Sequence, residues 1–244
     1  MSKPLLNLAV KDVLEQGCTF LDLVRNEVYV RPLEGTFAAS LGAHYRHKVK
    51  IDYSGTATFT QLPTGNDQLD ALVASRLPQG RPAVQTSIEF PSILSAGLAR
   101  DWKWWTVVAD VVFFQWSTFD QLPLTFPTEP GLDSVIPENY KNSWQVRAGV
   151  ERRLEEGWAL RLGYHYDRTP VPTESVSPLL PDNDRHCLSM GWSWTSTSRH
   201  VFVDGGLWYL FLPQRSTEGM NRDGYNGTYE NSAFTLGASL GYRF

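Results

Sequence analysis

Three arginines in the second half of the chain are the residues best suited to bind an anionic group. Arg147, Arg161 and Arg185 carry guanidinium groups, which can hold a carboxylate through two parallel hydrogen bonds. Carboxylates occur in the same region of the chain, at Glu151, Asp167 and Asp184. Because opposite charges pair across neighbouring strands, we expect an internal network of ion pairs. Binding of a ligand carboxylate by Arg147 and Arg161 is the alternative role.

A histidine close to an aspartate invites a catalytic interpretation. His165 lies two positions from Asp167, and a histidine oriented by a carboxylate can act as a general base. No serine stands in a nucleophile-elbow context, and no third group is placed to orient the pair. The two cysteines, Cys18 and Cys187, are far apart and are expected to be free thiols. The sequence therefore predicts no enzyme, no bound metal and no cofactor.

These side chains lie in segments that alternate between apolar and polar residues. In WALRLGYHY, from Trp158 to Tyr166, large apolar residues share one parity and small or polar residues share the other. A period of two over about ten residues is typical of a β-strand with two different environments. The pattern predicts strands at 36–59, 86–100, 103–119, 143–154, 158–168, 185–195, 200–212 and 230–244, with a shorter one at 26–32. No helical pattern follows residue 20, and residues 1–25 form a separate N-terminal segment, helical or irregular.

Bulk composition narrows the class of protein. No run of about 18 apolar residues exists, which excludes helical membrane spans. The formal charge of −4 argues against a nucleic-acid partner. Aromatic residues reach 13% of the chain, which suits a protein with much amphipathic surface.

The predicted connections alternate in length. Short turns follow three of the strands, whereas long polar links span 60–85, 120–141, 169–184 and 213–229. In an antiparallel meander, alternate loops emerge at opposite ends. A transmembrane β-barrel typically has short turns at one end, long loops at the other and strands of about ten residues. The fold prediction is therefore all-β: an antiparallel up-and-down transmembrane β-barrel over residues 26–244.

The last predicted strand has features of its own. It ends with FTLGASLGYRF, from Phe234 to Phe244. Because the long link 213–229 precedes this strand, its carboxyl terminus is expected at the end of the barrel that carries the short turns. Alternate positions carry Phe, Leu, Ala and Tyr, which would face lipid. A terminal aromatic after such a pattern resembles the signal read by the bacterial outer-membrane assembly machinery. We therefore predict that Tyr242 and Phe244 form an assembly signal.

The opposite parity is predicted to line a lumen. If Trp105 and Val107 face lipid, the alternate residues of 103–119 face inward. Inward apolar residues form a strip that could hold an alkyl chain: Val108, Val112, Phe114, Trp116, Phe202, Trp208 and Leu210. Packing of these residues against a plug, a loop or one another is the alternative.

Six stretches of the chain occur in an order that is typical of one family. They are YRHKVKIDYSG (45–55), IEFPSILSAGLA (88–99), WTVVADVVFFQWSTFDQL (105–122), YKNSWQVRAGVERRL (140–154), GYHYDRTPVP (163–172) and LPDNDRHCLSMGWSW (180–194). Together they resemble the long-chain fatty acid and hydrocarbon transporters of Gram-negative outer membranes, the FadL family of OMPP1/FadL/TodX type. The most specific positions are Asp167, Thr169, Pro170, Pro172, Pro181, Asp182, Asp184 and Arg185. The prolines and charges of 169–184 predict a braced outer loop.

The resemblance implies a monomeric barrel of about fourteen strands with a plug, held among outer-membrane lipids. It also implies passive transport of fatty acids or other hydrophobic small molecules. Only the last eight or nine strands have counterparts here, and residues 1–35 match neither an export signal nor the plug. We therefore expect a fragment or truncated form of such a transporter. Two alternatives stay open: a small structural or adhesive outer-membrane barrel without transport, and a soluble lipid-binding β-barrel.

Overall fold

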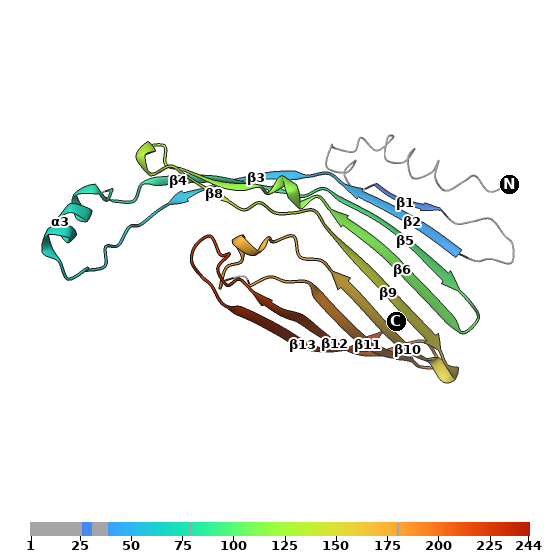
Figure 1. Cartoon of the computed structure of the whole chain (residues 1–244). Helices are drawn as coiled ribbons and strands as arrows, with labels where there is room; N and C mark the ends of the chain where they lie inside the picture. The colour runs from blue at the N-terminus through green and yellow to red at the C-terminus, as the bar shows by residue number, and fades with distance from the viewer. Residues whose placement is uncertain (1–25, 31–38, 79, 180) are drawn as a thin grey trace.

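A single curved sheet forms the main body of the protein. The computed structural model describes residues 26–30, 39–78, 80–179 and 181–244. The strands of the main sheet are β1 (Asn26–Val30), β2 (Ala39–Arg46), β5 (Ile93–Asp101), β6 (Trp105–Phe114), β9 (Ser143–Arg153), β10 (Trp158–Asp167), β11 (Arg185–Thr195), β12 (Val201–Ser216) and β13 (Thr228–Tyr242). Neighbours in this order are hydrogen-bonded and antiparallel, as Figure 1 shows. The predicted all-β, antiparallel, up-and-down architecture is confirmed, and within the described residues the sheet is open, with β1 and β13 as its edges.

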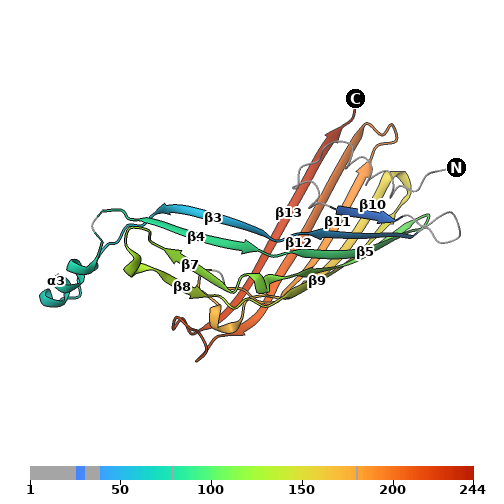
Figure 2. The ribbon, with the colours of Figure 1, turned by 90° about the horizontal axis from the view of Figure 1, so that it is seen from above.

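A second, four-stranded sheet extends beyond one end of the main sheet. It consists of β3 (Val49–Thr56), β4 (Ala83–Phe90), β7 (Gln121–Thr125) and β8 (Ser134–Pro137), in the order β3-β4-β7-β8. We call it the extension sheet. The α-helix α3 (Asp67–Arg76) lies at its far tip (Figures 1 and 2). None of the helices in the described residues has the length and apolar content needed to cross a membrane.

Two of the predicted strands, 36–59 and 86–100, are each split in two, so the prediction is wrong there. The described part of 36–59 forms β2 and β3, with a break at His47, and 86–100 falls in β4 and β5, with a break at Pro91. On either side of the breaks the partners differ, because β2 pairs with β5 whereas β3 pairs with β4. Proline has no N–H to donate, so Pro91 interrupts the ladder where the main sheet gives way to the extension sheet.

The helix α3 contradicts the prediction that no helix follows residue 20. The Asn66 side chain caps it by accepting hydrogen bonds of 3.1 Å from two backbone N–H groups of the first turn. None of its residues is buried. It therefore buries no apolar face against the rest of the protein, and hydrophobic periodicity gives only a weak signal of it. The predicted N-terminal segment 1–25, with Cys18, lies outside the described residues.

The two ends of the main sheet differ in the length of their loops, as the alternation of short and long connections in the sequence predicts. Short connections join β5 to β6, β9 to β10 and β11 to β12, and all lie away from the extension sheet (Figure 1). We call this the short-turn end. The carboxyl terminus lies here too, because the Arg243 N–H donates to the His200 carbonyl at 2.7 Å. In the β9–β10 turn, Gly157 has a φ of 79°, and a side chain there would overlap the Thr195 carbonyl.

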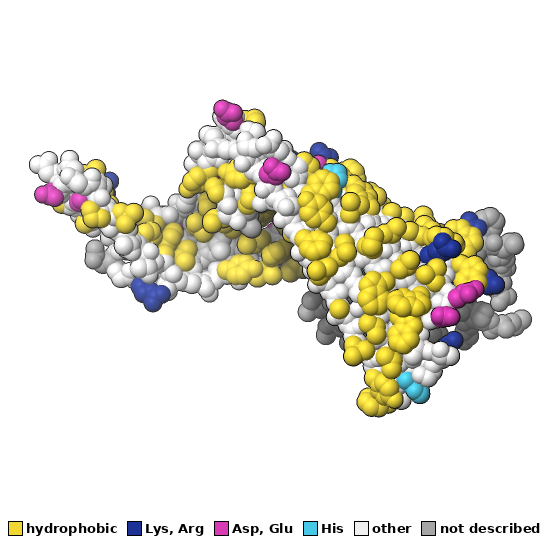
Figure 3. All heavy atoms as spheres, turned by 90° about the horizontal axis from the view of Figure 1, so that it is seen from below, with side chains coloured by type: hydrophobic (Ala, Val, Ile, Leu, Met, Phe, Trp, Pro, Cys, Tyr) yellow, Lys and Arg dark blue, Asp and Glu magenta, His cyan; other side chains and the backbone are white. Residues whose placement is uncertain are grey.

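The side chains of the main sheet divide between two faces according to the strand register. Leu162 lies opposite Val150 and Met190, whereas the neighbouring Arg161 lies opposite Glu151. We call the face of Leu162 the outward face and the face of Arg161 the inward face. Leu162 is 54% exposed, and large apolar side chains of the outward face are similarly open. Figure 3 shows apolar side chains spread over the outside of the curved sheet.

Candidate functional site

A row of ion pairs crosses the inward face between β6, β9 and β10. Arg147 Nε donates to Asp110 Oδ1 at 2.6 Å, and the two residues are directly opposed on β9 and β6. Arg161 Nε donates to Glu151 Oε2 at 2.7 Å across β10 and β9. The arginine side chains stay 50% and 46% exposed. Each pair therefore stabilises the sheet by only about 0.2–1 kcal/mol and leaves part of its guanidinium open to a ligand.

Arg153 continues this row toward the short-turn end. Its guanidinium contacts Glu151 and Asp101, each at 3.2 Å. The Thr106 hydroxyl also donates to Asp101, at 2.6 Å. These groups line a cavity of about 400 Å³, together with Arg161. The polar contacts of the inward face thus run from the middle of β9 to its short-turn end.

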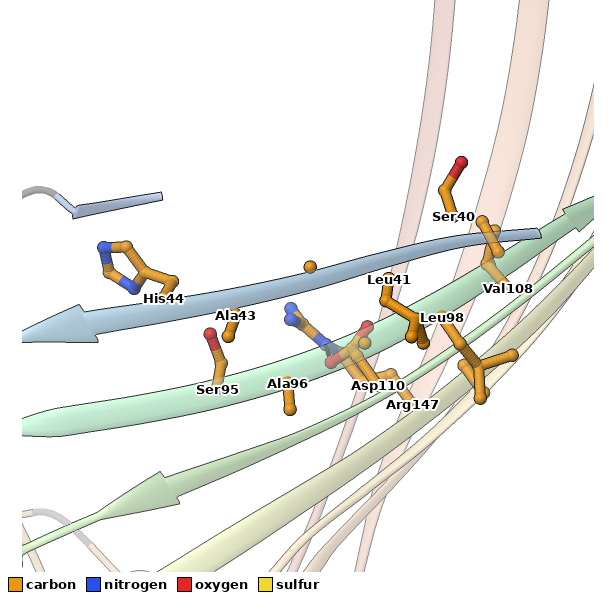
Figure 4. Close-up of a pocket in the computed structure, with 14 residues that line it drawn as sticks. Ser40, Leu41, Ala43, His44, Ser95, Ala96, Leu98, Val108, Asp110 and Arg147 are labelled. Atoms are coloured by element: carbon orange, nitrogen blue, oxygen red, sulfur yellow. Dashed lines mark hydrogen bonds and ion pairs between the residues drawn. The ribbon is translucent and has the colours of Figure 1, made fainter. Parts of the chain in front are cut away.

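A second cavity lies beside the Arg147–Asp110 pair. It measures about 420 Å³ and is bounded by β2, β5 and β6 (Figure 4). Figure 4 shows Ser95 on the inward side of β5 and Leu98 on the other side. Gly97 lies opposite Asp110, and a Cβ at this glycine would lie 3.0 Å from the Cβ of Asp110. The missing side chain therefore leaves the room that the ion pair occupies.

Glycines recur on the inward face of the central strands. Gly149 lies opposite Gly163, Gly191 lies opposite Gly206, and Gly206 lies opposite Gly237. We call these five residues the glycine row. Glycine contributes no side chain, so the backbone at Gly237 is open, whereas Val108 and Ser189 lean over Gly149 and Gly163.

The predicted apolar strip is divided into two groups. On β6 lie Val108, Val112 and Phe114, and on β12 lie Phe202, Trp208 and Leu210. Strands β9, β10 and β11 separate β6 from β12. At about 4.8 Å per strand, the two groups are roughly 19 Å apart along the sheet. Val108 and Trp208 are 42% and 37% exposed, whereas Val112 is buried.

Two residues of the predicted strip have different surroundings. Phe202 lies over Gly241 of β13, and a side chain at Gly241 would overlap its ring. Trp116 is not on the sheet. The predicted strand 103–119 is too long, because β6 ends two residues before Trp116, which begins a 3₁₀ turn. Its ring centroid lies 5.8 Å from that of Tyr140.

The link between β10 and β11 carries the remaining predicted charges. Arg185 Nη1 donates to Asp167 Oδ2 at 2.6 Å, so the expected pairing of Asp167 is present. Asp184 does not pair with an arginine within the described contacts. It accepts hydrogen bonds from the Thr169 N–H at 3.0 Å and from the Tyr166 hydroxyl. These contacts tie both ends of the link to each other.

Further contacts hold the middle of this link. Asp182 accepts hydrogen bonds from Arg185 and from the Thr169 hydroxyl. The Pro170 carbonyl accepts a hydrogen bond of 2.8 Å from the Lys141 N–H, two residues before β9 begins. The link is therefore joined to the neighbouring strand as well as to itself.

Arg215 of β12 is the main residue of this region that the sequence analysis did not identify. Its guanidinium donates to the backbone carbonyls of Asp182 and Val171, each at 2.8 Å, and to the Thr173 hydroxyl at 3.2 Å. Val171 and Val176 are 8% and 2% exposed, so this is one of the most buried parts of the protein. A lone arginine in a predicted long link carries no pattern that would point to this role.

Comparison with known proteins decides the family. Residues 33–244 match the model of the family described as "Outer membrane protein transport protein (OMPP1/FadL/TodX)". The chain belongs to this FadL family. It is 25% identical over 209 residues to the long-chain fatty acid transport protein of Escherichia coli O6:H1, covering 83% of this chain and 46% of that protein. The K12 protein of the same name is 24% identical over 201 residues, covering 82% and 44%.

Solved structures of FadL-type proteins share the fold. A FadL homologue of Pseudomonas aeruginosa matches with a TM-score of 0.64 and 18% identity, covering 84% of this chain and 49% of that one. The CymD monoaromatic hydrocarbon channel matches with a TM-score of 0.57 and 19% identity, covering 90% and 50%. The chain thus spans about half the length of the relatives that it matches.

Membership of the FadL family assigns the chain to the outer membrane of Gram-negative bacteria. The two faces of the main sheet agree with this location. Leu162, Met190 and Leu236 are 54%, 55% and 70% exposed on the outward face, where hydrocarbon can cover them. The soluble lipid-binding barrel therefore has no support.

Proposed function

We propose that the protein lets hydrophobic small molecules, long-chain fatty acids or hydrocarbons, pass the outer membrane passively and as a monomer. The observation that carries the proposal is the exposure of Val108 and Trp208 on the inward face, at 42% and 37%. Apolar side chains open to a lumen favour an apolar ligand. Relatives named long-chain fatty acid transport protein and monoaromatic hydrocarbon channel support the same ligand class.

The order of the strands suggests how an amphiphilic ligand would lie. Arg147 on β9 and Arg161 on β10 are between the β6 group and the β12 group of apolar residues. A carboxylate could therefore approach the open part of either guanidinium while its alkyl chain covers Val108 or Trp208. A hydrocarbon without a charged group needs only the apolar residues. The two ligand types are thus distinguished by their dependence on the arginines.

Uptake into vesicles tests this function. The full chain is reconstituted into lipid vesicles, and entry of a fluorescent long-chain fatty acid and of toluene is followed with and without protein. We expect Val108→Asn with Trp208→Asn to slow entry of both, because both substitutions place an amide in the apolar groups. Arg147→Gln with Arg161→Gln should slow the fatty acid alone. Val135→Asn, at a 54% exposed position of the extension sheet, is the matched control and should leave both rates unchanged.

Equal entry with and without protein would favour the other outer-membrane candidate, a structural or adhesive barrel. Slower entry in the control variant would mean that the loss reflects folding rather than ligand contact. Folding is followed in each variant by its mobility on gels before and after heating.

We also propose that the assembly machinery recognises Tyr242 and Phe244. The strand β13 ends at Tyr242, and Phe244 lies beyond it, fully exposed at 107%. Their rings pack edge to face, with centroids 5.2 Å apart. Phe244→Ala should lower the amount of chain inserted into the outer membrane in cells, while Phe234→Ala, in the middle of β13, should not.

A further inference from the structure

The outward face of the main sheet has an apolar hollow over β9, β10, β11 and β12. It measures about 640 Å³, and none of the described residues that line it carries a charge. Two rows of side chains border it, and neighbours within a row are directly opposed in the strand register. The first row is Ala148, Tyr164, Leu188 and Tyr209, and the second row is Val150, Leu162, Met190 and Leu207. We call this cavity the outward hollow, and its lining fits a hydrocarbon chain rather than an ion.

Two tyrosines of the first row lean away from the second row. The Tyr164 hydroxyl and His186 Nδ1 are hydrogen-bonded at 2.8 Å, and His186 lies two positions beyond Leu188, toward the end of the sheet opposite the short turns. Tyr209 stacks on Phe211, which lies in the same direction, with ring centroids 6.1 Å apart. Both rings are therefore held toward the long loops, and this leaves the space between the rows open.

Small residues add to this space. Ala148 occupies the β9 position of the first row with a single methyl group, and the residue opposite it on β6 is Ala109. The backbone of Gly149 and Gly163 lies between the rows and belongs to the lining. Ala148 is itself exposed, so a larger side chain at this position would enter the outward hollow.

The position of the outward hollow indicates which leaflet it faces. Short turns of outer-membrane barrels face the periplasm, so Tyr164 and His186 lie toward the outer leaflet. Aromatic rings gather at this level, and the ring centroids of Trp144 and Tyr166 are 5.1 Å apart. Such rings are typical of the zone where lipid head groups begin. The outward hollow is therefore continuous with the surface that hydrocarbon covers, and it begins just below the head groups.

We propose that the outward hollow holds one acyl chain of an outer-leaflet lipid, which stays bound instead of exchanging with its neighbours. The surrounding bilayer is as apolar as the lining, so close packing rather than the hydrophobic effect favours the bound chain. A chain between the two rows contacts side chains on both sides, and an empty hollow would forfeit these contacts. The ester group of the lipid then lies beside the polar ends of Tyr164 and His186. The site does not depend on what the inward face carries.

Native mass spectrometry tests this site. The full chain is placed in nanodiscs of phosphatidylethanolamine or of phosphatidylglycerol, and the lipids that stay bound after its release are counted. We expect one retained lipid per chain with either head group, because no charge in the lining selects between them. Ala148→Phe should abolish retention, since its ring fills the outward hollow. Tyr164→Phe should lower the retained fraction by roughly fivefold, because its ring loses the hydrogen bond that holds it aside.

The matched control is Ala238→Phe. It places the same ring on the outward face of β13, outside the lining of the outward hollow, and should keep the lipid. The proposal is overturned if the unaltered protein retains no lipid, or if folded Ala148→Phe retains as much as Ala238→Phe. Retention of phosphatidylglycerol alone also contradicts it, because a charged contact would then be responsible. Palmitate added in equal amount tests another occupant, and its retention in place of the phospholipid would show that the site does not hold a membrane lipid.

Discussion

Arg147 and Asp110 lie directly opposite each other on β9 and β6 and are joined by a hydrogen bond of 2.6 Å. The chain between them builds β7 and β8 of the extension sheet before it returns to the main sheet. The ion pair therefore joins the two main-sheet strands from which the chain leaves for the extension sheet and to which it returns.

A double-mutant cycle with Arg147→Gln and Asp110→Asn measures the strength of this pair. We expect a coupling free energy of about 0.2–1 kcal/mol, because both side chains are partly exposed and water screens them. The free energy of unfolding is obtained from urea titration in detergent or lipid. The more exposed Lys50–Asp52 pair, at 3.7 Å, should give a smaller value. A larger value for Lys50–Asp52 would contradict the expected role of geometry.

Gly241→Val should destabilise the protein, because its side chain would overlap the Phe202 ring. Forcing extra atoms into a packed contact typically costs about 1–3 kcal/mol. Gly237→Val is the matched control, since it lies on the same strand and face with nothing within 4 Å of an added Cβ. The thermal unfolding midpoint of each variant measures the effect: it should fall for Gly241→Val and change little for Gly237→Val. Phe202→Ala should rescue Gly241→Val, and a failure of rescue would show that the overlap is not the cause.

Arg215→Ala should loosen the link between β10 and β11. The change removes a charged donor from the Val171 and Asp182 carbonyls and leaves both without this partner. Hydrogen bonds to charged groups contribute about 1.5–3 kcal/mol each. Limited proteolysis should therefore cut within 171–182 at least tenfold faster, since 1.4 kcal/mol is a factor of ten. Arg199→Ala, in a short turn, should leave the cleavage rate unchanged, and intact loops in Arg215→Ala would contradict the bracing role.

Acid should release the chain before α3. The hydrogen bond from the Thr64 N–H, at 3.0 Å, holds the pKa of Asp70 below its usual range. A carboxyl whose folded pKa is lowered stabilises the fold above its unfolded pKa and loses this effect as the pH falls through the folded value. The exchange protection factor of the Thr64 amide should fall over that acidic range. Asp70→Asn should reduce the protection at neutral pH, whereas Asp67→Asn should not.

The sequence predicted the repetitive part of the fold and missed its interruptions. Alternation over ten residues is a strong signal, so the strands around Leu162 and Met190 were identified closely. The break at His47 carries no Gly, Pro or Asn, and it is set by a change of partner strand that local spacing does not encode. The helix α3 has no buried residue, so nothing in its sequence needed to be periodic.

The sequence identified many residues of the candidate site but few of the contacts between them. Parity placed Arg147 and Asp110 on one face, but only the strand order shows that they oppose each other. Trp116 followed the alternation and was assigned inward, yet β6 ends before it. Arg215 was missed because its two shortest hydrogen bonds go to the backbone carbonyls of Asp182 and Val171, and every residue carries a carbonyl.

The glycine row leaves five positions of the inner wall without side chains, and none of the five has a positive φ. Alanine therefore meets no unfavourable φ at any of them, although an added Cβ would lie 2.6 Å from Ser189 Oγ at Gly163 and 3.2 Å from Val108 Cγ2 at Gly149. Gly237 and Gly191 have the most room, since an added Cβ meets nothing within 4 Å at Gly237 and nothing closer than 3.6 Å at Gly191. The inward face thus offers a graded series of positions at which the width of the proposed passage can be engineered.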